Sequence, residues 1–119
     1  MGLDTTHNCW HGPYSSFMRF RLSLGYQIGI NLFDYEGYRD TPGLILSEIK
    51  HDLMPLFNHS DCDGILTVEE QKRIVAGLDD VIKNFNPGLD HDFDFLVKCE
   101  QFKNGCIEAI SKNEIIEFR

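Results

Sequence analysis

The sequence contains few basic residues, and they are scattered along the chain. Eleven Lys and Arg residues stand against 19 Asp and Glu residues, so the formal net charge is −8. Lys72 and Arg73 are the only basic residues that adjoin each other. Because proteins that bind nucleic acid neutralise phosphates with a surplus of cations, this composition argues against direct nucleic-acid binding. It is better suited to a divalent cation or a basic protein partner.

Long apolar runs are also absent. No run approaches the roughly 20 residues that a membrane-spanning helix needs. Residues 1–6 lack the basic and apolar regions of a secretory signal. The cysteines are Cys9, Cys62, Cys99 and Cys106, and the last two are too far apart along a predicted helix to form a disulfide within it. We therefore expect a soluble cytoplasmic protein with reduced thiols and no membrane partner.

Motifs of the common enzyme classes are missing as well. The sequence has no nucleophile elbow, phosphate-binding loop, dinucleotide-binding fingerprint or zinc-protease motif. It does have the length and composition of one globular domain over residues 1–119, with 42% hydrophobic and 25% charged residues. The nine Phe residues predict a core rich in aromatic side chains.

Hydrophobic periodicity predicts a single compact domain that is mainly α-helical, with about four helices and minor short β-strands. The predicted helices span residues 14–27, 44–54, 67–84 and 90–111. The best-marked helix begins with a capping box from Thr67 to Glu70, in which a hydroxyl and a carboxylate each accept a hydrogen bond from a backbone N–H. Short strands are predicted at 30–33 and 114–118, and residues 1–12 are predicted to be irregular.

The clearest chemical feature is the segment from His59 to Glu70, which reads HSDCDGILTVEE. Its spacing resembles that of the calcium loop of an EF-hand, which joins two helices. Gly64 stands at the sixth position of the loop, where the chain must turn with a positive φ. The predicted metal ligands are Asp61, Asp63, the backbone carbonyl of Ile65, Thr67 through a water, and Glu70.

His59 departs from the EF-hand pattern, because the first position of the loop normally holds an Asp. Without that carboxylate the loop supplies at most about six oxygen ligands, and we expect a Kd for Ca²⁺ of about 10⁻⁴–10⁻³ M. The imidazole favours zinc, nickel or another first-row metal instead. An alternative without metal is an empty helix–turn–helix, in which Asp61 and Asp63 bond to nearby N–H groups and Glu70 completes the helix cap.

A second group of candidate ligands lies near the amino terminus. His7 and His11 have the spacing of helical zinc ligands, and Cys9 lies between them. These residues could form half of a zinc site that the histidine or cysteine of residues 59–62 completes, or Cys9 could act as a nucleophile beside a histidine. In the alternative, Trp10 packs in the core while the histidines form hydrogen bonds at the surface.

Several short motifs are distributed from one end of the chain to the other: GLDTTH at 2–7, WHG at 10–12, NHSDCDG at 58–64 and EF at 117–118. On these motifs the chain resembles a family of small uncharacterised proteins from bacteriophages and bacterial genomes. The resemblance implies a phage or prophage origin and a bacterial cytoplasm. It implies no activity, because the family has none assigned.

These features predict a non-enzymatic binding or interaction module, with a protein partner and one EF-hand-like loop that holds a divalent cation weakly. One alternative is a metal- or thiol-dependent enzyme built from His7, Cys9, His11 and His59. Another is an acidic phage effector that inhibits a host protein through charge mimicry, which would require a contiguous acidic face. The sequence does not indicate an oligomeric state.

Overall fold

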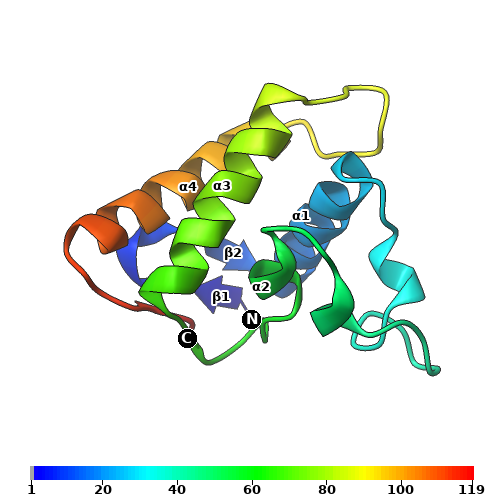
Figure 1. Ribbon diagram of the computed structural model, residues 1–119, viewed down its shortest axis with the longest axis horizontal. Coiled ribbons are helices and arrows are strands. Elements are labelled where there is room, and N and C mark those ends of the chain that lie inside the picture. Colours follow the sequence, from blue (N-terminus) through cyan, green and yellow to red (C-terminus); the bar gives the residue numbers. More distant parts are fainter. Residues whose placement is uncertain (1) are drawn as a thin grey trace.

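The computed structural model describes residues 2–119, which form four α-helices and two small antiparallel sheets (Figure 1). This confirms a mainly helical fold with minor β-structure. In chain order the elements are β1 Gly2–Asp4, β2 His11–Pro13, α1 Tyr14–Gln27, α2 Met54–Phe57, β3 Ile65–Leu66, α3 Val68–Lys83, α4 Phe95–Ser111 and β4 Ile116–Glu117. Three short 3₁₀ turns add to these, at Thr6–Asn8, Leu32–Asp34 and Leu46–Glu48.

The helices α3 and α4 pack against each other and form one side of the molecule (Figure 1). The predicted capping box starts α3: the Glu70 N–H donates to Thr67 Oγ1 at 3.2 Å, and the Thr67 N–H donates to Glu70 Oε1 at 2.9 Å. Each helix buries an apolar stripe, which includes Ile74 and Leu78 of α3 and Phe102 of α4. Burying these stripes against each other removes apolar surface from water and so stabilises the pair of helices.

The core between these helices and α1 is rich in aromatic rings, as predicted. Phe20 lies at its centre, with ring centroids 5.1 Å from Trp10, 6.0 Å from Phe95 and 6.2 Å from Phe102. Phe17 packs edge-on against Trp10 at 5.1 Å. Because these rings come from the residue before β2, from α1 and from α4, they hold three separate parts of the chain together.

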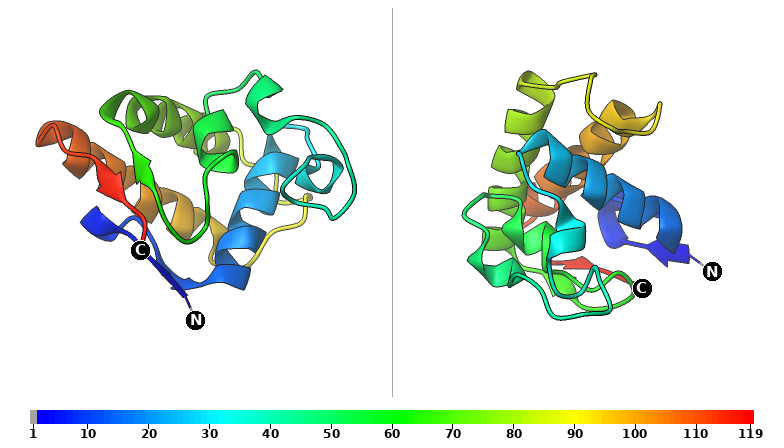
Figure 2. Two further views of the ribbon diagram at one scale, coloured as in Figure 1. Left: turned by 90° about the horizontal axis from the view of Figure 1, so that it is seen from below. Right: turned by 90° about the vertical axis from the view of Figure 1, so that its right-hand side faces the viewer.

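The two ends of the described chain lie side by side (Figure 2). β1 pairs with β2 in a hairpin, whereas β4 pairs with β3 from the middle of the sequence. Asp4 and Arg119 exchange two backbone hydrogen bonds, at 3.2 and 2.8 Å. The amino-terminal hairpin and the carboxyl-terminal tail are therefore joined into one continuous edge that also reaches the 59–70 segment.

The helices predicted at 14–27, 67–84 and 90–111 correspond to α1, α3 and α4, although α4 begins later, at Phe95. The strand predicted at 114–118 is confirmed as β4. The helix predicted at 44–54 is wrong, because the segment forms only a 3₁₀ turn and then the one-turn helix α2. Leu44 instead forms a β-bridge with Tyr35, and its backbone bonds to Asp34 and Glu36, so residues 44 and 45 do not start a helix.

Two further predictions are corrected. Residues 30–33 form no strand; instead, the Asn31 side chain caps a 3₁₀ turn by accepting a hydrogen bond from the Phe33 N–H. Residues 2–12, predicted to be irregular, belong to the β1–β2 hairpin, and residue 1 lies outside the described residues. His7 and Asn8 reverse the chain with φ angles of 61° and 55°. Such angles are uncommon for residues other than glycine, and a glycine in the turn is a common sequence sign of a hairpin. Because this turn contains no glycine, the hairpin is not recognisable from the sequence.

None of the helices within residues 2–119 combines the length and the apolar character needed to cross a bilayer.

Candidate functional site

The backbone of the 59–70 segment has several features that the EF-hand spacing predicts. Gly64 turns with a φ of 92°. Ile65 and Leu66 are extended in β3, and α3 leaves the segment at Val68. The helix before the segment, α2, is only one turn long, and β3 pairs with the carboxyl-terminal tail rather than with a second loop. An EF-hand-like helix–loop–helix is therefore not confirmed.

The imidazole of His59 lies inside this segment. Its Nδ1 is 2.7 Å from the Ser60 carbonyl oxygen, and its Nε2 is 2.9 Å from the Ile65 carbonyl oxygen. A neutral imidazole has one N–H and can donate to one of these carbonyls, whereas the doubly protonated ring donates to both. The ring also packs on Phe118, with centroids 4.0 Å apart. The Ile65 carbonyl, predicted as a metal ligand, is thus already a partner of the imidazole.

The predicted carboxylate ligands have separate surroundings. Glu70 accepts the Thr67 N–H in the capping box. Asp61 lines a cavity of about 330 Å³ together with Arg21 and Tyr38. Asp63 makes no side-chain hydrogen bond or ion pair with any other part of residues 2–119. In that range no three His, Cys, Asp or Glu side chains form a group that could hold a metal ion. Metal binding by this segment stays a prediction.

Arg21, an inward-facing residue of α1, holds the beginning of this segment. Its side chain is only 6% exposed, and its Nη1 donates to the His59 carbonyl at 2.7 Å and more weakly to the Leu56 carbonyl at 3.4 Å. The guanidinium lies over the rings of Phe17 and Tyr38, 4.6 and 5.1 Å from their centroids. Burial lowers the pKa of Arg21, while Tyr38 and Asp61 act in the opposite direction.

The sequence contains only an indirect signal for this role of Arg21. The residue follows Phe20 and lies four positions after Phe17, on the apolar stripe of α1. A charged residue on such a stripe either reaches the surface or finds polar partners inside. Only the packing of residues 56–59 against α1 shows which of these applies.

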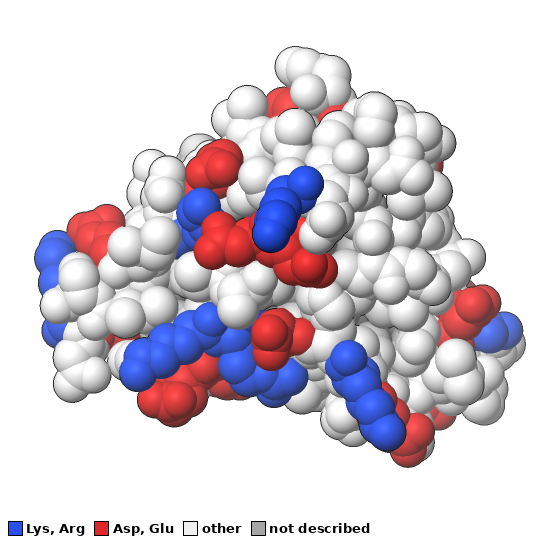
Figure 3. Space-filling model, turned by 45° about the horizontal axis from the view of Figure 1, so that its top comes forward, with Lys and Arg blue, Asp and Glu red and all other residues white. Residues whose placement is uncertain are grey.

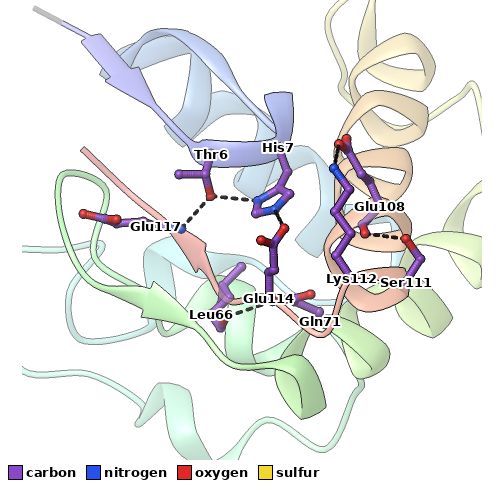
Figure 4. A network of polar contacts seen from close by, with 9 residues as sticks. All are labelled: Thr6, His7, Leu66, Gln71, Glu108, Ser111, Lys112, Glu114 and Glu117. Carbon is purple, nitrogen blue, oxygen red and sulfur yellow. Dashed lines mark hydrogen bonds and ion pairs between the residues drawn. The ribbon is translucent and has the colours of Figure 1, made fainter.

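The histidines near the amino terminus belong to different hydrogen-bond networks. His7 joins the amino-terminal segment to the tail, because its Nε2 is 2.9 Å from Glu114 Oε1 and its Nδ1 is 2.8 Å from Thr6 Oγ1 (Figure 4). Thr6 Oγ1 also accepts the Glu117 N–H at 3.0 Å. The hydrogen bond from His7 lowers the pKa of Glu114. His11 instead pairs with Asp4 at the surface.

Cys9 is fully buried, close to the backbone of Gly105 in α4. His7, Cys9 and His11 therefore point to three different places, and the structure does not bring them together with His59. The arrangement agrees with the alternative in which Trp10 is a core residue and the histidines form hydrogen bonds.

A cavity of about 270 Å³ lies between β2, the first turns of α1 and α4, and the residues just before α4. Its apolar wall consists of the rings of Trp10, Phe20, Phe93 and Phe95. Its polar wall includes Ser16, Arg19, Asp92, Asp94 and Lys98. Phe93 is completely exposed, with a relative exposure of 101%, so a large apolar side chain stands at the edge of this cavity.

Trp10 is a buried residue of this cavity whose indole N–H lacks a hydrogen-bond acceptor. It is 2% exposed, and its Nε1–H has no hydrogen-bond partner among residues 2–119. The Nε1 edge of the indole lies next to Gly12, which lines the same cavity. The Lys98 ammonium lies 4.9 Å from the centre of the indole. Arg19 is paired with Asp92 at 3.1 Å, whereas Lys98 has no carboxylate partner within the described chain.

Charges of both signs alternate on the face shown in Figure 3. Several surface carboxylates of the described chain are paired with a lysine, as Asp79 is with Lys103 at 2.9 Å and Glu69 with Lys72 at 3.4 Å. This face has no contiguous acidic area of the kind that charge mimicry would require.

Comparison with known proteins gives no match: no family model, curated protein or solved structure is similar to this chain.

Proposed function

We propose that this protein is a non-enzymatic binding module and that its ligand site is the cavity beside Trp10. The observation that carries the proposal is the buried indole N–H without an acceptor. Leaving such a donor unpaired costs about 1–3 kcal/mol, because it has lost its hydrogen bond to water. The N–H itself has almost no accessible surface, so a ligand in this cavity that offers an acceptor would recover that free energy by displacing the indole or the adjoining Gly12 slightly on binding.

The shape and lining of the cavity indicate what kind of ligand would fit. Sites for small molecules usually measure about 300–1,000 Å³ and combine apolar walls with a few polar groups. At about 270 Å³ the cavity is small, so it suits a compound with about one ring. Phe20, Phe93 and Phe95 would contact the ring, and Trp10 and Lys98 would face its acceptor.

The only Trp of the chain makes this proposal easy to test, because Trp10 fluorescence reports on the cavity itself. Small aromatic compounds with a hydrogen-bond acceptor, such as indazole and benzamide, should change the emission saturably and raise the urea midpoint. The proposal is wrong if no such compound does either.

Gly12→Ala is the matched variant. An added Cβ would lie 3.6 Å from Trp10 Nε1, an ordinary van der Waals contact, at a residue without positive φ. The variant should therefore fold, keep an acceptor from reaching the N–H and weaken ligand binding by about tenfold or more. Val97→Ala, at an exposed position of α4 outside the cavity, should leave affinity unchanged. Equal affinity of wild type and Gly12→Ala would contradict the assigned site.

A second candidate function is weak binding of a divalent cation by the 59–70 segment. The positive φ of Gly64 and the unpaired Asp63 carboxylate support it. Urea unfolding with millimolar Ca²⁺ or Mg²⁺, compared with chelator, tests it directly. An unchanged midpoint would rule it out at these concentrations.

A further inference from the structure

Two basic and two acidic side chains lie in the wall of the cavity beside Trp10, and only one basic and one acidic side chain are joined. Arg19 Nε donates to Asp92 Oδ2 at 3.1 Å. The charged groups of Asp94 and Lys98 form no ion pair and no hydrogen bond with any residue of the described range 2–119, although both residues line the same cavity. One cation and one anion of this wall are therefore left without a counter-charge.

Both of these free charged groups can be reached from outside. In residues 2–119 the buried side-chain N and O atoms without a hydrogen-bond partner are Trp10 Nε1, Arg21 Nε and Gln71 Oε1. Because the Lys98 ammonium and the Asp94 carboxylate are unpaired and are not among these atoms, solvent reaches both of them. A ligand can approach them in the same way, without displacing any buried group.

The helix α4 sets the spacing of the two charges. Asp94 is the residue before α4, its side chain does not cap the helix, and its carbonyl accepts the Lys98 N–H at 3.0 Å. The two side chains are therefore one turn apart on one face, with Cβ atoms separated by about 5–6 Å. An α-amino acid carries its ammonium and its carboxylate on one carbon, so a single molecule can contact both residues. A direct pair between them would be solvent-exposed and would compete only weakly.

An apolar surface adjoins these charges. Lys98 Nζ lies 4.9 Å from the centre of the Trp10 indole. The rings of Phe20, Phe93 and Phe95 complete the apolar wall, and the volume of about 270 Å³ suits about one ring. An aromatic side chain would therefore pack against these rings while the charged end of the same molecule lies at α4.

We propose that the ligand of this cavity is a free α-amino acid with an aromatic side chain, whose carboxylate pairs with Lys98 and whose ammonium group pairs with Asp94. The inference rests on the proposed function of the cavity and narrows its ligand from any small aromatic compound with an acceptor to a zwitterion. A ligand with a single charge would leave either the cation or the anion of the wall unpaired.

Three related compounds test the need for both charges. L-phenylalanine carries both, phenethylamine lacks the carboxylate, and 3-phenylpropionate lacks the ammonium group. Each is titrated into the wild-type protein at neutral pH, with Trp10 emission and the urea midpoint as readouts. L-phenylalanine should bind about fivefold or more tightly than either analogue, because each contact is a charge-assisted hydrogen bond that solvent partly screens.

Two variants assign each charge to its residue. Lys98→Met should weaken binding of L-phenylalanine about fivefold or more and should not weaken binding of phenethylamine, which has no carboxylate. Asp94→Asn should likewise weaken binding of L-phenylalanine and should not weaken binding of 3-phenylpropionate. Glu100→Gln is the matched control, because it removes a charge from an exposed position of α4 outside the cavity, and it should leave affinity unchanged.

The outcomes separate this inference from the proposed function. If L-phenylalanine binds no more tightly than its two analogues, or if neither variant weakens its binding, the zwitterion inference is overturned, while saturable binding of benzamide would still support the cavity as a ligand site. If neither L-phenylalanine nor benzamide binds, both proposals fail. The wild-type comparison decides the matter even if a variant does not fold.

Discussion

Replacing His59 by Asp tests the relation between the 59–70 segment and a calcium loop most directly. The change supplies the carboxylate that the first loop position lacks. It also removes the imidazole that contacts the Ile65 carbonyl at 2.9 Å and the Ser60 carbonyl at 2.7 Å. The Ile65 carbonyl would then be free to face a metal ion. The change should therefore lower stability in the absence of metal and raise stability when calcium binds. Unfolding with and without calcium measures the two effects separately.

Without metal, His59→Asp should be less stable than the wild type. A lost hydrogen bond costs about 0.5–1.5 kcal/mol, and a neutral imidazole can donate only one to these carbonyls. The packing of the ring on Phe118 is lost too. The new carboxylate also lies near Asp61 and Asp63 and repels them. We expect a total loss of about 2 kcal/mol, measured by urea unfolding in the presence of a chelator.

Calcium should offset most of this loss of stability. At 1 mM Ca²⁺ a wild-type Kd of about 10⁻⁴–10⁻³ M adds only about 0.4–1.4 kcal/mol. If the added carboxylate lowers the Kd to about 10⁻⁵ M, the variant gains about 2.7 kcal/mol. For a chain of this size that gain corresponds to a shift of the urea midpoint by about 1–2 M.

Two control variants make the result specific. His59→Ala removes the imidazole without adding a ligand, and should lose stability without gaining a calcium response. Adding Glu70→Gln to His59→Asp keeps a cap acceptor for the Thr67 N–H but removes a charged ligand, and should reduce the response. If His59→Asp shows no shift at 1 mM Ca²⁺, the carboxylates do not converge and the EF-hand interpretation of this segment is refuted.

Three further predictions concern packing, thiols and pH. Gly105→Ala should destabilise the protein by about 1–3 kcal/mol in urea unfolding, although Ala favours helix, because its Cβ would meet the His7 carbonyl oxygen at 2.8 Å; equal or higher stability would contradict this packing. Ellman's reagent should modify Cys62 alone in the native state and the other three thiols only in urea, since they are buried and burial raises the pKa of Cys99 to about 12; rapid modification of a second thiol would argue against it. The hydrogen bond from His7 lowers the pKa of Glu114, so the wild type should be more stable than Glu114→Gln above pH 4.5, the ordinary pKa of a glutamate. This difference should vanish as the pH falls through the lower pKa that Glu114 has in the folded state. A difference in urea midpoint that persists at pH 3 would refute this.

The sequence predicted correctly those features that depend on residues close together in the chain. The capping box and the apolar stripe of α3 involve residues three or four positions apart, so the sequence contains all the partners that decide them. The same holds for α1, which begins after Pro13 and presents Phe17 and Phe20 to the core. The helix predicted at 44–54 failed for a related reason: its spacing was helical, but the backbone of Leu44 bonds to Asp34 and Glu36, which lie outside the predicted helix.

The candidate sites depended on contacts between distant segments and could be predicted only in part. The spacing of the 59–70 segment correctly indicated the bend at Gly64. It could not show that the imidazole would bond to the Ile65 carbonyl or that Asp61 would share a cavity with Arg21. The unpaired Trp10 N–H was equally hidden, because an unmet donor is recognised only once every possible partner has a position.

The sequence alone determined the helical class, the acidic charge, the aromatic core and the places where α1 and α3 begin, because these depend on composition and on neighbours within one or two turns. Tertiary structure decided which polar groups are buried and which remain without partners. Arg21 is buried only because residues 56–59 pack over α1, and Trp10 only because β2, α1 and α4 meet around it. A side chain is buried by atoms from segments that lie tens of residues apart in the sequence. Its exposed fraction therefore depends on how those segments pack, which no local sequence pattern specifies.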